Sequence, residues 1–249
     1  MLGWRARLGL LVPAPNTVIE PEFASMVPPG VSTHAARMQI QGDPGFLEVI
    51  TKMAEGTEAA ADQLSFCADV IAYACTAGSF ANGSQWDVNL IHRIEKVTGK
   101  PATTTARSLV QAARALGSTN LVVATPYRVD VNDHMANYLQ ENGLKVLNIR
   151  GLGLYKAGDP AKVQSQALYA LVKDAYLTGC DCILISCTDM PTVHLIGPIE
   201  KDFGVPVITS NQATFWHLLR LAGIRGSLPE FGRLMSLDLV DAKFKARAT

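Results

Sequence analysis

The sequence lacks an excess of charge of either sign, because 22 Lys and Arg residues are balanced by 22 Asp and Glu residues in 249. Electrostatics therefore gives no argument for a nucleic-acid or membrane partner. No stretch reaches the ~20 consecutive apolar residues that a membrane-spanning helix needs, and the first residues lack the pattern of a signal peptide. We expect a cytoplasmic protein that binds neither nucleic acid nor membrane.

Motifs for nucleotides and metals are also missing. The glycines form no dinucleotide-binding or phosphate-loop pattern, and the five histidines show no zinc spacing. Cys180, Cys182 and Cys187 are close in sequence, but the first two flank or occupy an apolar strand, where free cysteine is a common small hydrophobic residue. The sequence predicts no metal site, and all five cysteines are expected to be thiols.

Short apolar runs alternate with longer amphipathic stretches along the whole chain. The runs predict strands at residues 8–12, 31–37, 70–74, 102–104, 121–124, 145–149, 182–186 and 205–209. Helical periodicity is present over residues 46–64 and 162–177. This alternation predicts the α/β class, with parallel sheets covered by helices on both faces.

An internal repeat divides the chain. Residues 68–76, ADVIAYACT, align with residues 180–188, CDCILISCT, and a Gly-x-Pro segment follows each copy, at Gly99 and at Gly204. The repeat predicts two similar lobes, at residues 1–117 and 118–225, related by a pseudo-twofold axis. The tail, residues 226–249, has no counterpart in the repeat.

The repeat places Cys75 and Cys187 just past the ends of equivalent strands. Ligands of open α/β sheets bind at the carboxyl ends of strands, so the two thiols are predicted to face one pocket between the lobes. Backbone N–H groups in the small residues that follow, among them Thr76, Ala77 and Thr188, suit a thiolate or a bound carboxylate. The alternative for each cysteine is a buried structural thiol.

Three further polar side chains lie at strand ends. Asn16 either donates its amide to a carboxylate or caps the helix that contains Pro21. Tyr127 and Asn132 follow the equivalent strand of the second lobe, where Tyr127 is either an anion donor or a packed aromatic residue. His194 is a candidate proton relay to Cys187 or a histidine of a surface turn.

At these residues the chain resembles the aspartate/glutamate racemase superfamily, and within it maleate cis–trans isomerase and arylmalonate decarboxylase. The resemblance is carried by residues 11–17 (LVPAPNT), 73–75 (YAC), 124–132 (ATPYRVDVN) and 186–187 (SC). It implies that Asn16 contacts substrate, that Cys75 is the nucleophile, and that Thr76 and Tyr127 serve a carboxylate pocket. Two departures stand out. The decarboxylase has glycine at the position of Cys75, and the isomerase lacks the run Cys-Thr-Ala-Gly-Ser found here.

The repeat and the resemblance together predict a cofactor-independent isomerase that acts on a small dicarboxylate by cysteine addition, bond rotation and elimination. A homo-oligomer is expected. The alternatives are a two-cysteine racemase or epimerase, an arylmalonate-type decarboxylase, and a non-catalytic carboxylate-binding module. Cys75 is predicted to be the nucleophile because no acid adjoins it in sequence, whereas Asp189 beside Cys187 favours a protonated thiol.

Overall fold

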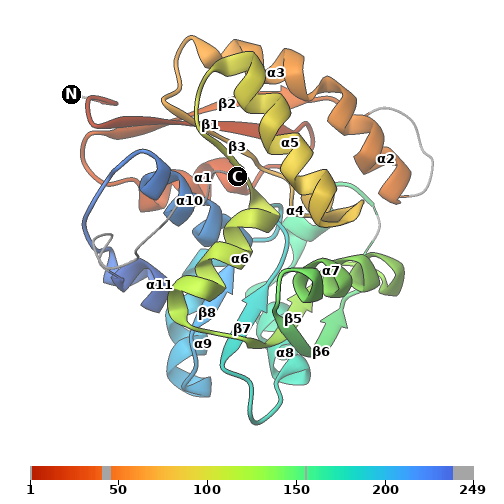
Figure 1. Cartoon of the computed structure of the whole chain (residues 1–249). Helices are drawn as coiled ribbons and strands as arrows, with labels where there is room; N and C mark the ends of the chain where they lie inside the picture. The colour runs from red at the N-terminus through yellow and green to blue at the C-terminus, as the bar shows by residue number, and fades with distance from the viewer. Residues whose placement is uncertain (1, 41–45, 155, 238–249) are drawn as a thin grey trace.

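A computed structural model describes residues 2–40, 46–154 and 156–237 of the chain. Its strands form two parallel four-stranded sheets in separate halves of the molecule (Figure 1). The strands are β1 (Ala6–Pro13), β2 (Val31–Met38), β3 (Val70–Tyr73), β4 (Ala102–Thr104), β5 (Asn120–Thr125), β6 (Lys145–Gly151), β7 (Cys182–Ile185) and β8 (Val207–Thr209). All eight strands predicted from the sequence are present.

Helices cover both sheets. The α-helices are α1 (Ile19–Met26), α2 (Phe46–Met53), α3 (Thr57–Ser65), α4 (Thr76–Phe80), α5 (Gly83–Thr98), α6 (Thr105–Leu116), α7 (Val129–Glu141), α8 (Ser165–Ala175), α9 (Ile196–Phe203), α10 (Ser210–Leu221) and α11 (Arg233–Ser236). Short 3-10 helices are η1 (Ala54–Gly56), η2 (Pro160–Lys162), η3 (Val193–Leu195) and η4 (Pro229–Phe231). None of the described helices is long and apolar enough to cross a membrane.

The two sheets have the same strand order. The first runs β2-β1-β3-β4 and the second β6-β5-β7-β8, with every neighbouring pair parallel. The central strands are apolar along almost their whole length, as strands buried on both faces must be; Leu8, Leu10 and Leu11 of β1 are fully buried. The predicted α/β class with two similar lobes is confirmed.

One predicted helix is interrupted. Instead of a single helix over residues 46–64, the structure has α2, the 3-10 turn η1 and then α3. Gly56, the last residue of the turn, has φ −85° and ψ 3°, outside the α-helical region. The second predicted helix, over residues 162–177, is α8 and spans only Ser165–Ala175.

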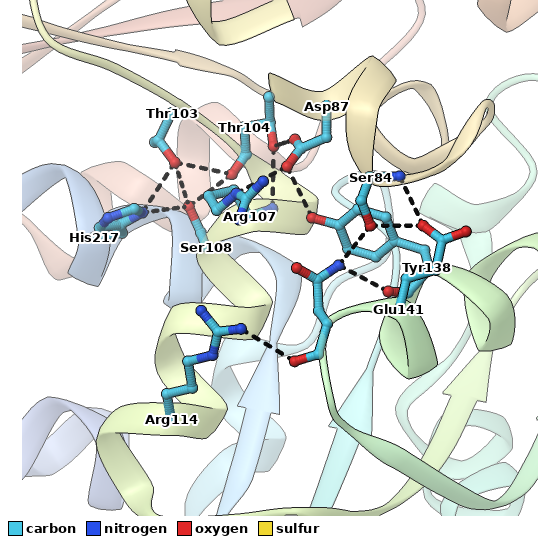
Figure 2. A network of polar contacts seen from close by, with 11 residues as sticks. Ser84, Asp87, Thr103, Thr104, Arg107, Ser108, Arg114, Tyr138, Glu141 and His217 are labelled. Atoms are coloured by element: carbon cyan, nitrogen blue, oxygen red, sulfur yellow. Dashed lines mark hydrogen bonds and ion pairs between the residues drawn. The ribbon is translucent and has the colours of Figure 1, made fainter. Parts of the chain in front are cut away.

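The lobes meet along α6 and α10, which lie between the two sheets (Figure 1). Beside these helices a buried polar network joins both lobes (Figure 2). The fully buried carboxylate of Asp87 on α5 accepts hydrogen bonds from Arg107 Nε at 2.9 Å and from the hydroxyl of Tyr138, on α7, at 2.9 Å. The ring of His217 on α10 lies within hydrogen-bond distance of Thr103, at 2.9 Å.

The first part of the predicted tail packs on the second lobe. Leu234 and Met235 of α11 are buried, and Arg233 N–H donates to the Glu200 carboxylate at 3.0 Å. The side chain of Gln212 donates to the carbonyl oxygen of Phe231 at 2.7 Å. Residues 238–249 lie outside the described residues, and the lobe boundaries at residues 117/118 and 225/226 stay predictions.

Candidate active site

A pocket opens between the lobes, at the carboxyl ends of strands from both sheets. It has a volume of about 80 Å³, several times the ~10–15 Å³ that one water molecule requires in a cavity, so it suits a small ligand. Both lobes line it, with Pro13, Pro15, Asn16, Ile40, Ile50, Cys75, Thr76 and Ala77 from the first and Tyr127, Leu154, Lys156, Ala157, Gly158, Pro160, Cys187, Thr188 and Asp189 from the second. The predicted pair of thiols therefore lines one pocket.

Cys75 is the N-cap of α4. Its backbone is extended, with φ −138° and ψ 109°, and its sulfur accepts the N–H of Gly78 at 3.4 Å. Burial raises the pKa of the Cys75 thiol to about 12, although hydrogen bonds from the Gly78 and Ala77 N–H groups lower it. The thiol is thus protonated at neutral pH, with two backbone donors in place for the thiolate.

Cys187 has a different backbone geometry. Its φ is 132°, which makes it the only non-glycine residue with positive φ in the described part of the chain. Its N–H donates to Ser210 Oγ at 3.0 Å, and its sulfur accepts the N–H of Asp189 at 3.4 Å. Burial raises the pKa of the Cys187 thiol to about 12, and the charges of Asp189 and Cys75 also raise it. Such strain persists at functional sites because the surroundings enforce it.

The expectation that no acid opposes ionisation of Cys75 was wrong. The carboxylate of Asp189 lines the pocket, and its charge raises the pKa of Cys75 as well as that of Cys187. The effect of Asp189 on Cys75 could not be predicted from the sequence, because Asp189 is far from Cys75 along the chain and belongs to the other lobe. Burial raises the pKa of Asp189 itself, against a hydrogen bond from Thr17 N–H and the charge of Arg37.

The structure shows the local function that the sequence allowed for Asn16, and its contact with a carboxylate stays a prediction. Its side-chain oxygen accepts the N–H groups of Val18 and Ile19, at 3.0 and 3.1 Å, just before α1. This turns the amide nitrogen toward the other lobe, where it donates to Thr188 Oγ1 at 3.1 Å. Asn16 therefore stabilises the turn before α1, and its amide reaches the other lobe beside the pocket that it lines.

Tyr127 lines the pocket from the second lobe and is buried. Burial holds the pKa of its phenol well above the usual range, and the charges of Cys187 and Cys75 act in the same direction. The hydroxyl is thus a hydrogen-bond donor at any physiological pH. Tyr127 lines the same pocket as both thiols.

A family model for arylmalonate decarboxylase matches residues 8–235. The chain belongs to the arylmalonate decarboxylase family. Arylmalonate decarboxylase of Bordetella bronchiseptica is 31% identical to it over 87% of this chain and 81% of the relative. Maleate isomerase of Geobacillus stearothermophilus is 24% identical, over 92% of this chain and 97% of the relative. The structure of maleate isomerase from Pseudomonas putida S16 with maleate superposes with a TM-score of 0.88 at 25% identity, covering 94% of this chain and 99% of that one.

Two of the predicted residues lie outside the pocket lining of this family member. Asn132 is buried and its side-chain oxygen accepts the hydroxyl of Thr125 at 2.6 Å, behind the end of β5. His194 is exposed, and its ring lies 2.7 Å from Ser165 Oγ. The structure thus places His194 in a surface turn, the alternative that the sequence also allowed.

Sequence reasoning missed the apolar wall of the pocket. Ile40 follows the end of β2 and Leu154 follows the end of β6, and these two edge strands are equivalent in the repeat. The rule that ligands bind at carboxyl ends of strands, applied to the edge strands too, would have found both. Lys156, beside Leu154, was missed because an exposed lysine in a loop carries no pattern of its own.

Proposed function

We propose that this protein is a cofactor-independent isomerase that converts a small cis-unsaturated dicarboxylate, of the maleate type, into its trans isomer. The observation that carries the proposal is the pair of thiols, Cys75 and Cys187, on one small pocket between related lobes. A single thiol suffices to deliver a proton, whereas addition with proton transfer uses two groups. Relatives named maleate isomerase cover the chain nearly end to end.

In the proposed reaction the Cys75 thiolate adds to one alkene carbon, and the Cys187 thiol protonates the neighbouring carbon. The former double bond is now single and rotates. The Cys187 thiolate then removes the proton it gave, the carbon–sulfur bond breaks, and the trans alkene leaves with the Cys75 thiolate restored. Cys75 is assigned as nucleophile because two backbone N–H groups, of Gly78 and Ala77, stabilise its thiolate.

Carboxylate binding is assigned to donors from both lobes. The amide of Asn16, the hydroxyl of Tyr127 and the backbone around Thr76, Ala77 and Thr188 line the pocket. Donors fixed in advance stabilise charge that develops on a carboxylate during addition. Asn132 is assigned a supporting function, because it holds Thr125 behind the pocket.

The direct test is a panel of small dicarboxylates followed by proton NMR in heavy water. The proposal predicts conversion of the cis to the trans alkene. Exchange of an α-proton on a saturated substrate, with no isomerisation, would instead support a racemase or epimerase. Binding of dicarboxylates without turnover of any would support a carboxylate-binding module.

Substitution of each cysteine tests the assignment of roles. Cys75→Ser should abolish turnover, since a serine hydroxyl is a poor nucleophile without an activating base. Cys187→Ser should keep slow activity and accumulate a covalent adduct on Cys75, detected by intact-mass spectrometry with maleate and located by peptide mapping. An adduct on Cys187 of the Cys75→Ser variant, with none on Cys75 of the other, would reverse the assignment.

Decarboxylation is the second candidate, favoured by the apolar wall of Ile40, Ile50 and Leu154, which suits an apolar substituent next to the carboxylates. It is also the activity for which the 31% identical relative is named. The two candidates separate cleanly at Cys75: a decarboxylase that needs only Cys187 as proton donor keeps its activity in Cys75→Ala, whereas the isomerase loses it. A cytoplasmic location and a homo-oligomeric state remain predictions from the sequence.

A further inference from the structure

The segment that follows Cys187, residues 188–193, is held by contacts from the opposite lobe. Thr17 N–H donates to Asp189 Oδ1 at 3.0 Å, and Thr188 Oγ1 donates to the carbonyl oxygen of Ala74 at 3.2 Å. These contacts join residues 172 and 114 positions apart. Contacts from the other lobe thus act together with the bond from Cys187 N–H to Ser210 to hold the residues around Cys187 at its positive φ.

Glu22 on α1 makes the most extensive of these contacts. Its Oε1 accepts the N–H groups of Thr192, at 2.5 Å, and Val193, at 2.8 Å. Its Oε2 accepts an N–H of Asn211 at 2.6 Å, and the amide nitrogen of Asn211 also donates to the carbonyl oxygen of Thr188 at 3.1 Å. One carboxylate thus holds both ends of the segment after Cys187, the near end through Asn211 and the far end directly.

The lobes differ in this respect. Cys75 caps α4 with ordinary extended backbone angles, and the turn over residues 75–79 is closed by its own hydrogen bonds, with one bond to the other lobe, from Thr76 Oγ1 to Ser210 Oγ at 2.9 Å. Cys187 has strained angles and a following segment that depends on a residue far away in sequence. A disturbance at α1 should therefore reach Cys187 and leave Cys75 largely unchanged.

We propose that Glu22 is a positioning residue for Cys187: its carboxylate, together with Asn211, holds residues 188–193 so that the Cys187 thiol faces the pocket in its strained conformation. All hydrogen-bond partners of Glu22 are donors, and they favour its charged form, whereas burial raises the pKa of this carboxyl. Glu22 touches neither thiol and does not line the pocket, so it acts through the segment alone.

The test measures the thiols directly and needs no substrate. Glu22→Gln, Glu22→Ala and Asn211→Ala are treated with iodoacetamide, and the alkylation rates of Cys75 and Cys187 are compared in the same molecules by peptide mapping. Released from its contacts, Cys187 should become more exposed, so the ratio of the Cys187 rate to the Cys75 rate should rise about tenfold in Glu22→Ala and less in Glu22→Gln. The effects of Glu22→Gln and Asn211→Ala should be non-additive because the two residues share one network.

Glu200→Gln is the matched control. Glu200 is buried and, like Glu22, accepts backbone N–H groups, from Val207 at 3.0 Å and Arg233 at 3.0 Å, but neither partner belongs to residues 188–193. This variant should lose stability without changing the thiol ratio. An unchanged ratio in the Glu22 variants, or equal acceleration of both thiols, would show that Glu22 only joins the lobes.

A kinetic readout follows wherever the isomerase proposal holds. Displacement of Cys187 should lower kcat at least tenfold in Glu22→Gln with a smaller change in KM, because Asn16, Tyr127 and the backbone after Cys75 lie outside the released segment and only the donor at Thr188 moves with it. This arm rests on the proposed function, whereas the alkylation ratio does not. Failure of the NMR panel in the unaltered protein would contradict the isomerase and leave the positioning of Cys187 to be decided by alkylation.

Discussion

At the scale of single residues, the two thiols resemble each other in their pKa and differ in their backbone. Burial dominates both, and it outweighs the N–H groups that point at each sulfur. The free protein therefore keeps its thiols protonated, and ionisation belongs to a step after ligand enters or at raised pH. The following two predictions test this interpretation.

Alkylation of Cys75 and Cys187 should rise about tenfold per pH unit from pH 7 to pH 10 without levelling off, because burial raises the pKa of each thiol to about 12. Free cysteine in the same buffer should level off above its pKa of ~8.5. The rates are measured with iodoacetamide and quantified per peptide. A plateau for either protein thiol below pH 9 would mean that its N–H donors outweigh burial.

Asp189→Asn should lower the pKa of both thiols, since the Asp189 charge raises the pKa of each. Asparagine keeps the side-chain oxygen that accepts Thr17 N–H, so the segment after Cys187 should hold its position. We expect alkylation of both thiols at pH 8 to accelerate by roughly two- to tenfold, as for removal of a nearby like charge. Acceleration of Cys187 alone would place the carboxylate farther from Cys75 than we infer.

At the scale of elements, the turn after Cys75 depends on glycine. A Cβ built on Gly78 would lie 2.7 Å from the hydroxyl oxygen of Tyr73 and 3.2 Å from the sulfur of Cys75. Gly197, on α9, has no atom within 4 Å of the same added Cβ. Gly78 is therefore a helical glycine with no room for a methyl group, and Gly197 is one with room for it.

Gly78→Ala should lower the free energy of unfolding by about 1–3 kcal/mol, because the methyl group overpacks the space between Tyr73 and Cys75. Gly197→Ala should be neutral or stabilise by about 0.5–1 kcal/mol, since alanine restricts the unfolded chain and fits the helix. Urea unfolding followed by circular dichroism measures both. Equal stability of the two variants would contradict the close packing at Gly78.

The elements and the chemistry-bearing residues were largely predictable, and the reasons are physical. Strands such as β1 and β7 are continuous apolar runs, and the repeat put Cys75 and Cys187 at equivalent strand ends. The break at η1 was not predicted, because the stripe of apolar residues continues across it. The contacts of Glu22 and the influence of Asp189 on Cys75 were not predicted. Each acts across more than a hundred residues, where local sequence patterns carry no information.

At the scale of the whole molecule, the buried polar network that joins the lobes contains a histidine, His217, whose protonation is unfavourable in the folded protein. His217 sits in the network of Figure 2 between α6 and α10, and its ring is buried. Burial lowers the pKa of His217 to about 4, and the charges of Arg107 and Arg220 contribute. The folded protein therefore favours the neutral ring.

The packing of the lobes should weaken in acid. A histidine in the unfolded chain has a pKa near 6.5, so between pH ~6.5 and pH ~4 the unfolded state binds more protons and folding stability falls as pH falls. The loss approaches about 3 kcal/mol. His217→Gln should remove that part of the pH dependence, seen as a flatter plot of Tm against pH over this range. An unchanged slope would show that other groups cause the acid sensitivity.

The division of the site between lobes also has a consequence during synthesis. Cys75 leaves the ribosome 112 residues before Cys187 (187 − 75), an interval of about 6–22 s at roughly 5–20 residues per second. Throughout it, the nascent chain lacks the residues of the second lobe that line the other side of the pocket. The Cys75 thiol is then more accessible to oxidants than in the finished protein, where it is buried. The second lobe thus protects Cys75 once it has folded, and oxidation of Cys75 should be more frequent on nascent chains than on the completed protein.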